Sequence, residues 1–370
     1  MANVVTLIPY NVFPAKLGGQ KGIACFYKFF SKYHNLTCIT VNKNDPSFAE
    51  YKVLNILSNS KFRYINIAYF FKLQKILKEF QINDLIIEHP YFGWLGIFLK
   101  MTLPIKLIVH SHNIESLRFK SIGKWWWSIL WYYEKWVHSH ADCTFCKTEE
   151  DRNFFINEYK IKPDRCHVIT YGIEWDKIPS KLDIQNARDR IINTYNLQDD
   201  TLLFLFNGTL SYPPNLKAVN NILNDINPLL LKSLNNYKII ICGKGLPDSM
   251  NQLKEYSAEN IIYAGFVEDI DLFFRGVDVF INPVIDGGGI KTKLVEALGS
   301  NLDAVSCKSG AIGISEKICN GKLHITLDED WNTFASKMTN SKNEQSNIKQ
   351  EFFAHFYWDN IAKKAASLID

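Results

Sequence analysis

The sequence predicts two α/β domains, each built on a doubly wound parallel sheet with helices on both faces. Three observations predict this fold class. The chain has 370 residues, more than one ordinary hydrophobic core accommodates. Short, continuously apolar runs alternate with longer amphipathic segments, which is typical of buried parallel strands joined by helices. This rhythm stops in a polar stretch at about 172–200 and then starts again.

The expected elements follow this rhythm along the chain. In the first half we expect strands at Val4–Pro9, Leu36–Val41, Leu85–Glu88, Lys106–His110 and Cys143–Cys146, and helices at Gln20–Tyr33, Tyr64–Phe80 and Lys124–His138. In the second half we expect strands at Leu202–Phe206, Lys238–Cys242, Ile261–Ala264, Val279–Asn282 and Leu302–Ser306. The polar stretch contains a helical pattern at Ile184–Tyr195. We place the boundary there, giving domains 1–172 and 173–354. Ligands should then bind beyond the carboxyl ends of the strands, in a cleft between the domains.

Composition and charge narrow the class of protein. The chain is 47% hydrophobic and 22% charged, as in ordinary globular proteins. It begins without a signal-peptide pattern and has no run of about 18 apolar residues, so we expect a cytoplasmic location. We interpret the eight cysteines, including Cys143 and Cys146, as reduced core thiols. Residues 1–170 carry 22 Lys and Arg against 13 Asp and Glu, a balance of +9. This basic half suits anionic lipid or an acidic acceptor, or is an ordinary solvated surface.

The strongest local motif is a glycine-rich turn between a buried strand and a helix. Val279–Asn282 is followed by Gly287, Gly288 and Gly289, then by Ile290, Lys291, Thr292 and Lys293. Amide groups and the helix dipole favour an anion at such a start, and two lysines there are unfavourable unless an anion offsets them. The motif therefore predicts a phosphate site. Glu296 lies two turns further, where a carboxylate can accept hydrogen bonds from a ribose diol.

Other strand ends carry glycine turns or histidines. Gly18 and Gly19 precede the first helix, without the spacing of a dinucleotide fingerprint. Asn207-Gly208-Thr209 and Gly265-Phe266-Val267 end two strands of the second domain. His110 and His112 end a strand of the first, where imidazole can donate to or polarise a hydroxyl. Each turn alone is a common loop, but several in one domain favour a ligand site.

Taken together, these motifs resemble the retaining glycosyltransferases of family 4, which have the GT-B fold of two Rossmann-like domains and use nucleotide sugars. The pieces that carry the resemblance are His112–Glu115, Tyr171–Ile173, Asn207–Leu210 with Pro214-Asn215, Gly265–Val267 and Gly287–Ala297. It implies an acceptor-side domain 1–172, a nucleotide-sugar-binding domain 173–354, and a last helix, 355–370, that crosses back to the first domain.

The resemblance also implies roles for individual residues. His112 matches the histidine near the transferred sugar, with His110 as the alternative. The donor-binding positions are Gly18, Gly19, Gly208, Thr209, Gly265, Phe266, Val267, Gly288, Gly289, Ile290, Lys291, Thr292, Lys293 and Glu296. Glu296 matches the second Glu of the E-x7-E motif, which binds the donor ribose.

The chain departs from the family pattern at two places. The first Glu of E-x7-E falls at Gly288, and Asp286 is the candidate to replace it. Thr209 stands where the family has an Arg after the glycine turn, and the following Lys is missing as well. We hypothesise that Lys291 or Lys293 supplies the lost positive charge.

The implied reaction moves a sugar from a nucleoside diphosphate to a hydroxyl of a glycan or lipid-linked acceptor in bacterial-type surface polysaccharide synthesis, with retention. The expected enzyme is a metal-independent hexosyltransferase that needs no cofactor beyond its nucleotide-sugar substrate and does not bind nucleic acid. Asp269-Ile270-Asp271 looks like a metal motif, but we interpret it as a helix start. Two alternatives stay open: a non-catalytic nucleotide-sugar-binding partner subunit, and a sugar-nucleotide 2-epimerase of the same fold. An NAD-dependent oxidoreductase fails on the glycine spacing.

The segment 118–136 is rich in aromatic and basic residues. We expect positions 125, 129, 132 and 136 to form the helix face that packs on the sheet. The segment is then either a buried core helix or an interfacial helix that makes the protein peripheral on the inner face of the membrane.

Overall fold

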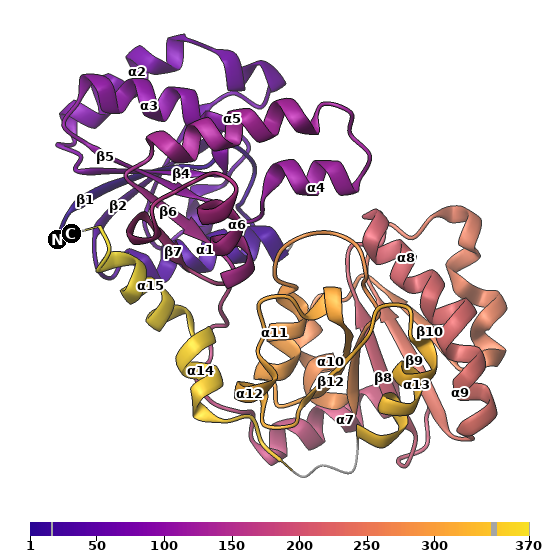
Figure 1. Cartoon of the computed structure of the whole chain (residues 1–370). Coiled ribbons are helices and arrows are strands. Elements are labelled where there is room, and N and C mark those ends of the chain that lie inside the picture. Colours follow the sequence, from indigo (N-terminus) through magenta and orange to yellow (C-terminus); the bar gives the residue numbers. More distant parts are fainter. Residues whose placement is uncertain (16–17, 342–345, 370) are drawn as a thin grey trace. The chain divides into compact units, whose positions relative to one another are not determined.

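The computed structural model describes residues 1–15, 18–341 and 346–369, and these form two compact units (Figure 1). Unit 1 comprises Met1–Glu174, Gly288–Ile290 and Phe356–Asp370. Unit 2 comprises Trp175–Gly287 and Lys291–His355. Each unit contains one parallel sheet with helices packed on it, as the sequence predicts.

Unit 1 is built on a seven-stranded sheet in the order β3-β2-β1-β4-β5-β6-β7. The strands are β1 (Asn3–Leu7), β2 (Asn35–Val41), β3 (Lys52–Leu57), β4 (Asp84–Glu88), β5 (Lys106–His110), β6 (Cys143–Cys146) and β7 (Cys166–Val168). The helices are α1 (Gly18–Phe30), α2 (Ala68–Glu79), α3 (Gly93–Thr102), α4 (Glu115–Ser121), α5 (Trp127–His140) and α6 (Glu149–Asn157). One core cluster joins α2, α3 and α5 to one face of this sheet.

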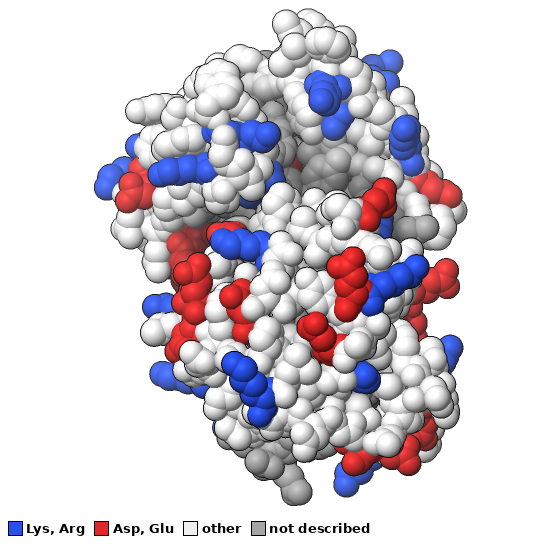
Figure 2. Space-filling view, turned by 90° about the vertical axis from the view of Figure 1, so that its right-hand side faces the viewer, with Lys and Arg blue, Asp and Glu red and all other residues white. Residues whose placement is uncertain are grey.

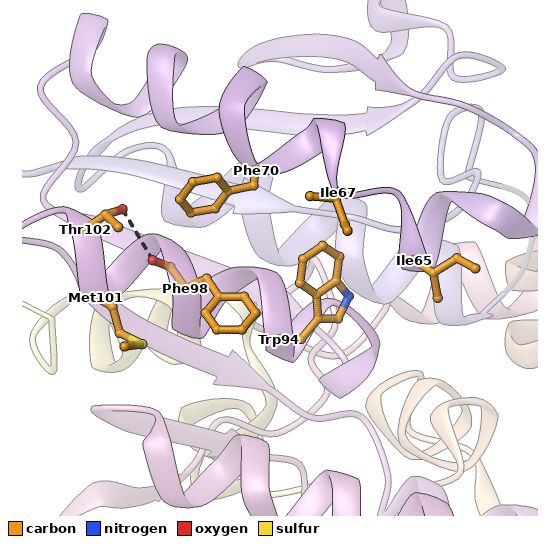
Figure 3. Close-up of a pocket in the computed structure, with 7 residues that line it drawn as sticks. All are labelled: Ile65, Ile67, Phe70, Trp94, Phe98, Met101 and Thr102. Carbon is orange, nitrogen blue, oxygen red and sulfur yellow. Dashed lines mark hydrogen bonds between the residues drawn. The ribbon is translucent and has the colours of Figure 1, made fainter.

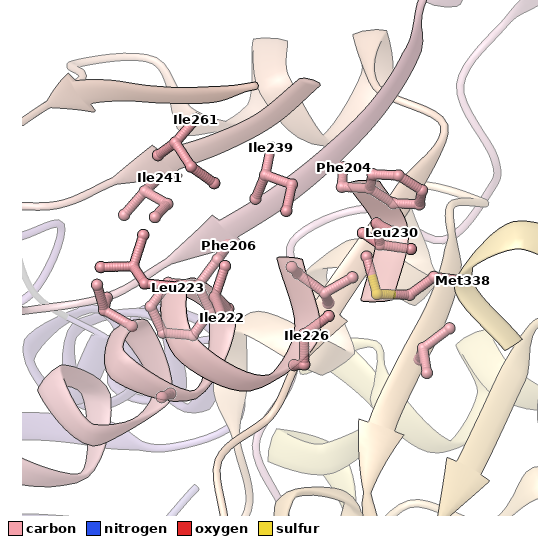
Figure 4. Packing of buried hydrophobic residues seen from close by; sticks show 14 of the residues in the cluster. Phe204, Phe206, Ile222, Leu223, Ile226, Leu230, Ile239, Ile241, Ile261 and Met338 are labelled. Atoms are coloured by element: carbon pink, nitrogen blue, oxygen red, sulfur yellow. The ribbon is translucent and has the colours of Figure 1, made fainter. Parts of the chain in front are cut away.

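Unit 2 is built on a six-stranded sheet in the order β10-β9-β8-β11-β12-β13. The strands are β8 (Leu202–Asn207), β9 (Tyr237–Cys242), β10 (Ile261–Gly265), β11 (Val279–Asn282), β12 (Asp303–Cys307) and β13 (Leu323–Thr326). The helices are α7 (Lys181–Tyr195), α8 (Pro213–Asn221), α9 (Asn227–Ser233), α10 (Ile270–Gly276), α11 (Thr292–Gly299), α12 (Glu316–Cys319) and α13 (Trp331–Asn340). In its core, isoleucines of the helical segment between α8 and α9 pack on aromatic and aliphatic side chains of β8 and β9 (Figure 4).

The helix in the expected linker region starts with a capping box. Ser180 and Asp183 exchange side-chain-to-backbone hydrogen bonds at the start of α7. Asp269 caps α10 by accepting from the amide of Leu272. The interpretation of Asp269-Ile270-Asp271 as a helix start is therefore confirmed.

Three strands, β3, β7 and β13, were not predicted, and all three lie at an edge of a sheet. An edge strand has only one neighbour and one half-exposed side, so it does not need a continuous apolar run. β3 illustrates this, because it contains Lys52 and Asn55 and is mostly half-buried.

The end of the chain returns to unit 1, as the fold class predicts. α14 (Gln350–Phe356) leads into α15 (Trp358–Ala366), which packs on α1. The backbone of Ile173 accepts from Trp358 and donates to Phe356. The Trp358 ring is buried between Phe26 and Tyr171, with centroid distances of 6.2 and 5.3 Å.

We expect Trp358→Ala to lower the free energy of unfolding by about 3–5 kcal/mol, because it leaves a large cavity between α1 and α15. Urea unfolding followed by tryptophan fluorescence measures the change. Lys363→Ala, at an exposed position of the same helix, is the control and should change stability by less than about 0.5 kcal/mol. Equal urea midpoints for the two variants would contradict the anchoring role of α15.

Candidate functional site

In both sheets there is a switch point, where successive strands stop adding to one side of the first strand and begin adding to its other side. In unit 1 this switch lies between β1 and β4, and in unit 2 between β8 and β11. Open parallel sheets bind ligands beyond the carboxyl ends of the strands at such a point. The residues that the sequence singled out lie at the carboxyl ends of strands or at the helix starts that follow them.

The loop after β11 leads directly into α11. Gly287 and Gly289 have φ angles of 84° and 71°, a region that favours glycine, so the turn depends on these residues. Lys291 precedes the first residue of α11, and no side chain caps that helix start. The Lys291 Nζ donates to the carbonyl of Gly287 at 2.9 Å, which ties the loop to the helix start. A glycine turn ahead of a helix start can present amide groups to an anion.

Lys293 is the partly buried cation of this site. Its Nζ donates to the carbonyl of Asn207 at 2.6 Å and to the Oδ1 of Asn215 at 3.0 Å, and it lies 4.6 Å from the centre of the Phe206 ring. Burial and, to a smaller extent, the charge of Lys291 lower the pKa of Lys293 to about 7, while the Glu296 carboxylate opposes this shift. An anion beside this group would hold it in the charged form.

Lys293 also lies against the glycine turn after β8. A Cβ atom at Gly208 would come within 2.9 Å of the Lys293 Nζ. The ammonium group therefore stands beside Gly208 and Thr209, where the family pattern has its own cations. Of the two lysines in the hypothesis, Lys293 is the one placed at this turn, while Lys291 bonds within its own loop.

The ends of β8, β9 and β10 are packed tightly together by glycines. The amide of Gly208 donates to Cys242, and that of Gly243 donates to Gly265 at 2.7 Å. A Cβ at Gly243 would lie 1.9 Å from the Gly208 carbonyl oxygen, so only glycine fits there. Gly265 has a φ of 66°, and the Phe266 ring after it is 56% exposed. An exposed ring at a strand end is available for stacking.

Asp286 and Glu296 lie on either side of this loop and helix start. Asp286 forms an ion pair of 2.9 Å with Lys217, and both side chains are about half exposed. The ion pair engages Oδ2 of this carboxylate. Glu296 lies on α11 and is partly buried, as expected for a carboxylate near the start of that helix.

In unit 1 a buried carboxylate, Glu88 at the end of β4, organises the site. It accepts hydrogen bonds from Tyr27 and from the Nε2 of His112, and from the Nδ1 of His110 at 2.9 Å. Lys147, which follows β6, donates from its Nζ to the Nε2 of His110 at 2.7 Å. Residues from α1 and the end of β5 thus contact this carboxylate, and Lys147 is linked to it through His110.

The protonation states follow from these partners. Burial alone would raise the pKa of Glu88, but the two histidines and their hydrogen bonds hold it well below its usual range. Burial lowers the pKa of His110, and it lowers the pKa of His112 well below the usual range. Both rings are therefore neutral at pH 7. Burial lowers the pKa of Lys147 to about 8, which leaves it charged at neutral pH. Because the Nε2 of His112 carries the proton donated to Glu88, its Nδ1 is a hydrogen-bond acceptor.

The two histidines differ in access. His110 is fully buried with both ring nitrogens bonded, whereas the His112 side chain is 15% exposed. His112 is therefore the one that can contact a ligand.

A second buried carboxylate supports the same histidine. Glu115 accepts from Tyr91 at 2.7 Å, pairs with Arg118 at 2.6 Å, and bonds the Nδ1 of His89 at 3.0 Å. The His89 ring stacks on His112 with centroids 4.6 Å apart. His89 has a φ of 62°, which is unusual for a residue other than glycine. This strained backbone and the second acid fix one side of the His112 ring.

The potential metal ligands Glu88, His110 and His112 have donor atoms within 4.8 Å of one another. The surroundings of these atoms fit hydrogen bonds among the three side chains better than a bound metal ion. A metal held by His110 would face the charged Lys147 Nζ, which already occupies the Nε2 of that ring. It would also replace the protons that both histidines donate to Glu88.

The sequence did not predict Glu88, Tyr27, Lys147 or His89 as part of a site. One signal was present, since Glu88-His89-Pro90 places ionisable residues at the end of a buried strand. The partners of Glu88 lie 22 to 61 residues away in the chain, so spacing alone could not connect them.

The two parallel-sheet units have the fold of the GT-B glycosyltransferases. Residues 29–177 match the profile of Glycosyltransferase Family 4, and residues 201–341 match that of Glycosyl transferases group 1. The chain therefore belongs to the family 4, group 1 glycosyltransferases.

Individual relatives are distant. An uncharacterised 44.6 kDa protein in the cps region of Klebsiella pneumoniae is 24% identical, over 96% of this chain and 95% of that one. The structure of HepE from Anabaena in complex with UDP matches with a TM-score of 0.74 and 14% identity, covering 99% of this chain and 98% of that one. The structure of WaaG, a glycosyltransferase involved in lipopolysaccharide biosynthesis, matches with a TM-score of 0.67 and 13% identity, covering 99% of both chains. The structural matches show the shared fold.

Proposed function

We propose that the protein transfers a hexose from a nucleoside diphosphate sugar to a hydroxyl of a glycan or lipid-linked acceptor, with retention, in surface polysaccharide synthesis. The observation that carries the proposal is Lys293, a partly buried cation held beside the glycine turn of β8 and the start of α11. A partly buried ammonium group at such a turn is suited to a diphosphate. UDP bound to HepE and the lipopolysaccharide role of WaaG support this choice of donor and pathway.

In this proposal the leaving diphosphate is stabilised by fixed charges and dipoles. The amides of Gly288–Thr292 and the Lys293 ammonium meet the negative charge that develops as the glycosidic bond breaks. This arrangement needs no metal ion. Phe266, between Gly265 and Val267, stacks on the base, and Glu296 accepts from the ribose hydroxyls.

His112 is assigned to the transferred sugar. Its neutral ring accepts a hydrogen bond at Nδ1 from a sugar hydroxyl, while Glu88 holds the ring through Nε2. Glu88 acts through His112 and is a positioning residue. Gly18 and Gly19, in the exposed first turn of α1, are assigned to the donor phosphates.

The epimerase alternative needs carboxylates that reach the sugar ring. Two buried acids at this edge of unit 1 are Glu88 and Glu115, and hydrogen bonds occupy both oxygens of each. Neither is placed to exchange a proton with a sugar carbon. The partner-subunit alternative is favoured by Gly288 and Thr209, because the family pattern has a glutamate and an arginine at these positions.

Binding of the donor can be tested by thermal shift. We expect one nucleoside diphosphate sugar in a panel to raise the melting temperature, because a ligand that binds only the folded state stabilises it. At a ligand concentration 100 times the dissociation constant the gain is about 2.7 kcal/mol. If neither sugar nucleotides nor nucleoside diphosphates shift the melting temperature, the assignment of unit 2 as a donor domain is wrong.

A further inference from the structure

The α5 helix is oriented opposite to the sequence-based expectation. Trp125, Ile129, Tyr132 and Trp136 were expected to pack on the sheet, and all four are exposed, Trp125 by 80%. The buried face instead carries Glu134, Val137 and His138. Neither the expected packing face nor the wholly buried helix is correct.

Polar partners inside unit 1 explain this orientation. Glu134 accepts from the amides of Glu115 and Ser116 at 2.9 and 3.0 Å, at the start of α4, and from the Tyr159 hydroxyl at 2.8 Å. His138 bonds the hydroxyl of Thr144 at 3.0 Å. These bonds need Glu134 and His138 on the inside, and the aromatic stripe then points outward.

Two neighbouring helices also expose apolar side chains. Phe98 and Met101 are exposed on α3, and Ile67 and Phe71 are exposed at the start of α2. Among the described residues, ten of the 16 exposed large hydrophobic side chains lie between residues 62 and 136. Such a concentration marks an interaction surface rather than ordinary scatter.

The exposed stripes of the three helices share one side of unit 1. The opposite sides of α2, α3 and α5 pack into the same core cluster on one face of the sheet, through residues such as Leu73, Leu95 and Val137. The exposed side chains therefore point away from that sheet face. We call these seven side chains the apolar face: Ile67, Phe71, Phe98, Met101, Ile129, Tyr132 and Trp136.

A groove of about 600 Å³ lies within this surface, between the start of α2 and α3 (Figure 3). Its lining is Ile65, Ile67, Phe70, Trp94, Phe98, Met101 and Thr102. The polar atoms of the lining side chains are bonded within the protein. The Trp94 Nε1 donates to Tyr64 at 2.7 Å, and the Thr102 hydroxyl donates to Leu99 at 3.1 Å. The groove therefore offers apolar contact, which suits a hydrocarbon chain.

The segment that carries the apolar face is rich in positive charge. Residues 60–140 contain 11 Lys and Arg against five Asp and Glu, and four of those acids are buried. Lys72, Lys75 and Lys78 are exposed on α2, the helix that contributes Phe70 to the groove. On the face of unit 1 that Figure 2 displays, lysine and arginine side chains are set among uncharged surface. This pattern complements an anionic surface.

We propose that unit 1 docks on an anionic phospholipid bilayer through the apolar face, with a lipid chain entering the groove between α2 and α3. Exposed Trp and Tyr with lysines around an apolar patch are typical of contact with the interfacial region of a membrane. No helix in the described part of the chain has the length and hydropathy to cross a bilayer, so the contact is with its surface. The proposal extends the contact expected for 118–136 to α2 and α3, and it does not depend on the donor site.

Vesicle flotation of the full chain tests the proposal. We expect it to float with vesicles of phosphatidylcholine and phosphatidylglycerol in equal parts, and much less with phosphatidylcholine alone. The triple variant Ile67→Asp, Phe71→Asp, Met101→Asp should stay in the bottom fraction. The matched control is Leu182→Asp with Leu327→Asp, equally exposed positions of unit 2, which should float like the wild type.

Replacing Lys72, Lys75 and Lys78 by Gln should weaken binding to the anionic vesicles about a hundredfold, since each lysine near the surface contributes about fivefold. Unchanged melting temperatures verify that the variants fold. Absence of flotation in the wild type, or flotation of the Asp triple variant, would overturn the proposal. A third result would also overturn it: the wild type self-associates but does not bind vesicles, and the Asp triple variant does not self-associate. A second copy of the chain would then cover the apolar face. Flotation needs no donor, so its outcome is independent of the proposed activity.

Discussion

Lys293→Met is expected to lower kcat about 10²- to 10³-fold and to weaken binding of the nucleoside diphosphate. The reason is that Lys293 is the cation held at the β8 turn, and removal of one preorganised donor to a developing negative charge costs about this much. Methionine keeps the length and the apolar stem that lies over Phe206. Kinetics of nucleoside diphosphate release and calorimetric titration with the nucleotide measure the two effects.

Two controls separate this role from general charge or stability. Lys217→Met removes an exposed lysine that pairs with Asp286, and it should change kcat by much less than tenfold. Lys291→Met removes a lysine that bonds within its own loop. Its loss of kcat should be larger than that of Lys217→Met and smaller than that of Lys293→Met. If Lys293→Met retains full activity while Lys291→Met loses it, the cation of the site has been assigned to the wrong residue.

The same residue gives donor binding a pH dependence. Burial lowers the pKa of Lys293 to about 7 without ligand, so the group is mostly neutral at pH 8. A diphosphate favours the charged form, and binding above pH 7 must therefore take up a proton. The affinity should fall by up to about tenfold per pH unit above 7 in the wild type, and this decline should be absent in Lys293→Met.

Glu88→Gln is expected to lower kcat about 10²-fold or more while leaving the affinity for the donor nearly unchanged. The amide keeps the shape of the carboxylate, but its NH₂ group can donate to the Nε2 of His112. That exchange would place the His112 proton on Nδ1, where the proposal requires an acceptor. Buried acids that fix a histidine tautomer have effects of this size or larger.

A double-mutant cycle shows whether Glu88 acts through His112. His112→Ala alone should cost at least as much as Glu88→Gln, and the double variant should be no worse than His112→Ala. Tyr27→Phe removes a different donor to Glu88 and leaves both histidine contacts in place, so its effect on kcat should be small. Additive losses in the double variant would mean that Glu88 has only a structural role.

Much of the fold could be predicted because central parallel strands are buried on both faces. Segments such as Val279–Asn282 then consist of continuous apolar residues, which stand out in the sequence. The edge strands β3, β7 and β13 lack this constraint and were missed. The orientation of α5 was predicted wrongly because periodicity counts apolar residues. The helix is held by the buried polar bonds of Glu134 and His138 instead.

The donor motif could be predicted because its parts are close in sequence: glycines, two lysines and a glutamate within ten residues of one loop and helix. The placement of Lys293 beside Gly208 could only be hypothesised, since it depends on β8 and β11 being neighbours in the sheet. The Glu88 cluster could not be predicted in the same way, because its members come from α1, β4, β5 and β6. A lone Glu at a strand end has many ordinary explanations.

Turnover of nucleotide sugars tests the central claim most directly. The full chain is incubated with a panel of nucleoside diphosphate sugars and lipid-linked or glycan acceptors, and both nucleoside diphosphate and sugar products are followed. The account predicts acceptor-dependent release of nucleoside diphosphate from one donor, with the anomeric configuration of that sugar retained in the product and activity lost in Lys293→Met. Binding without turnover for every donor and acceptor, or conversion of the donor to an epimer, would contradict it.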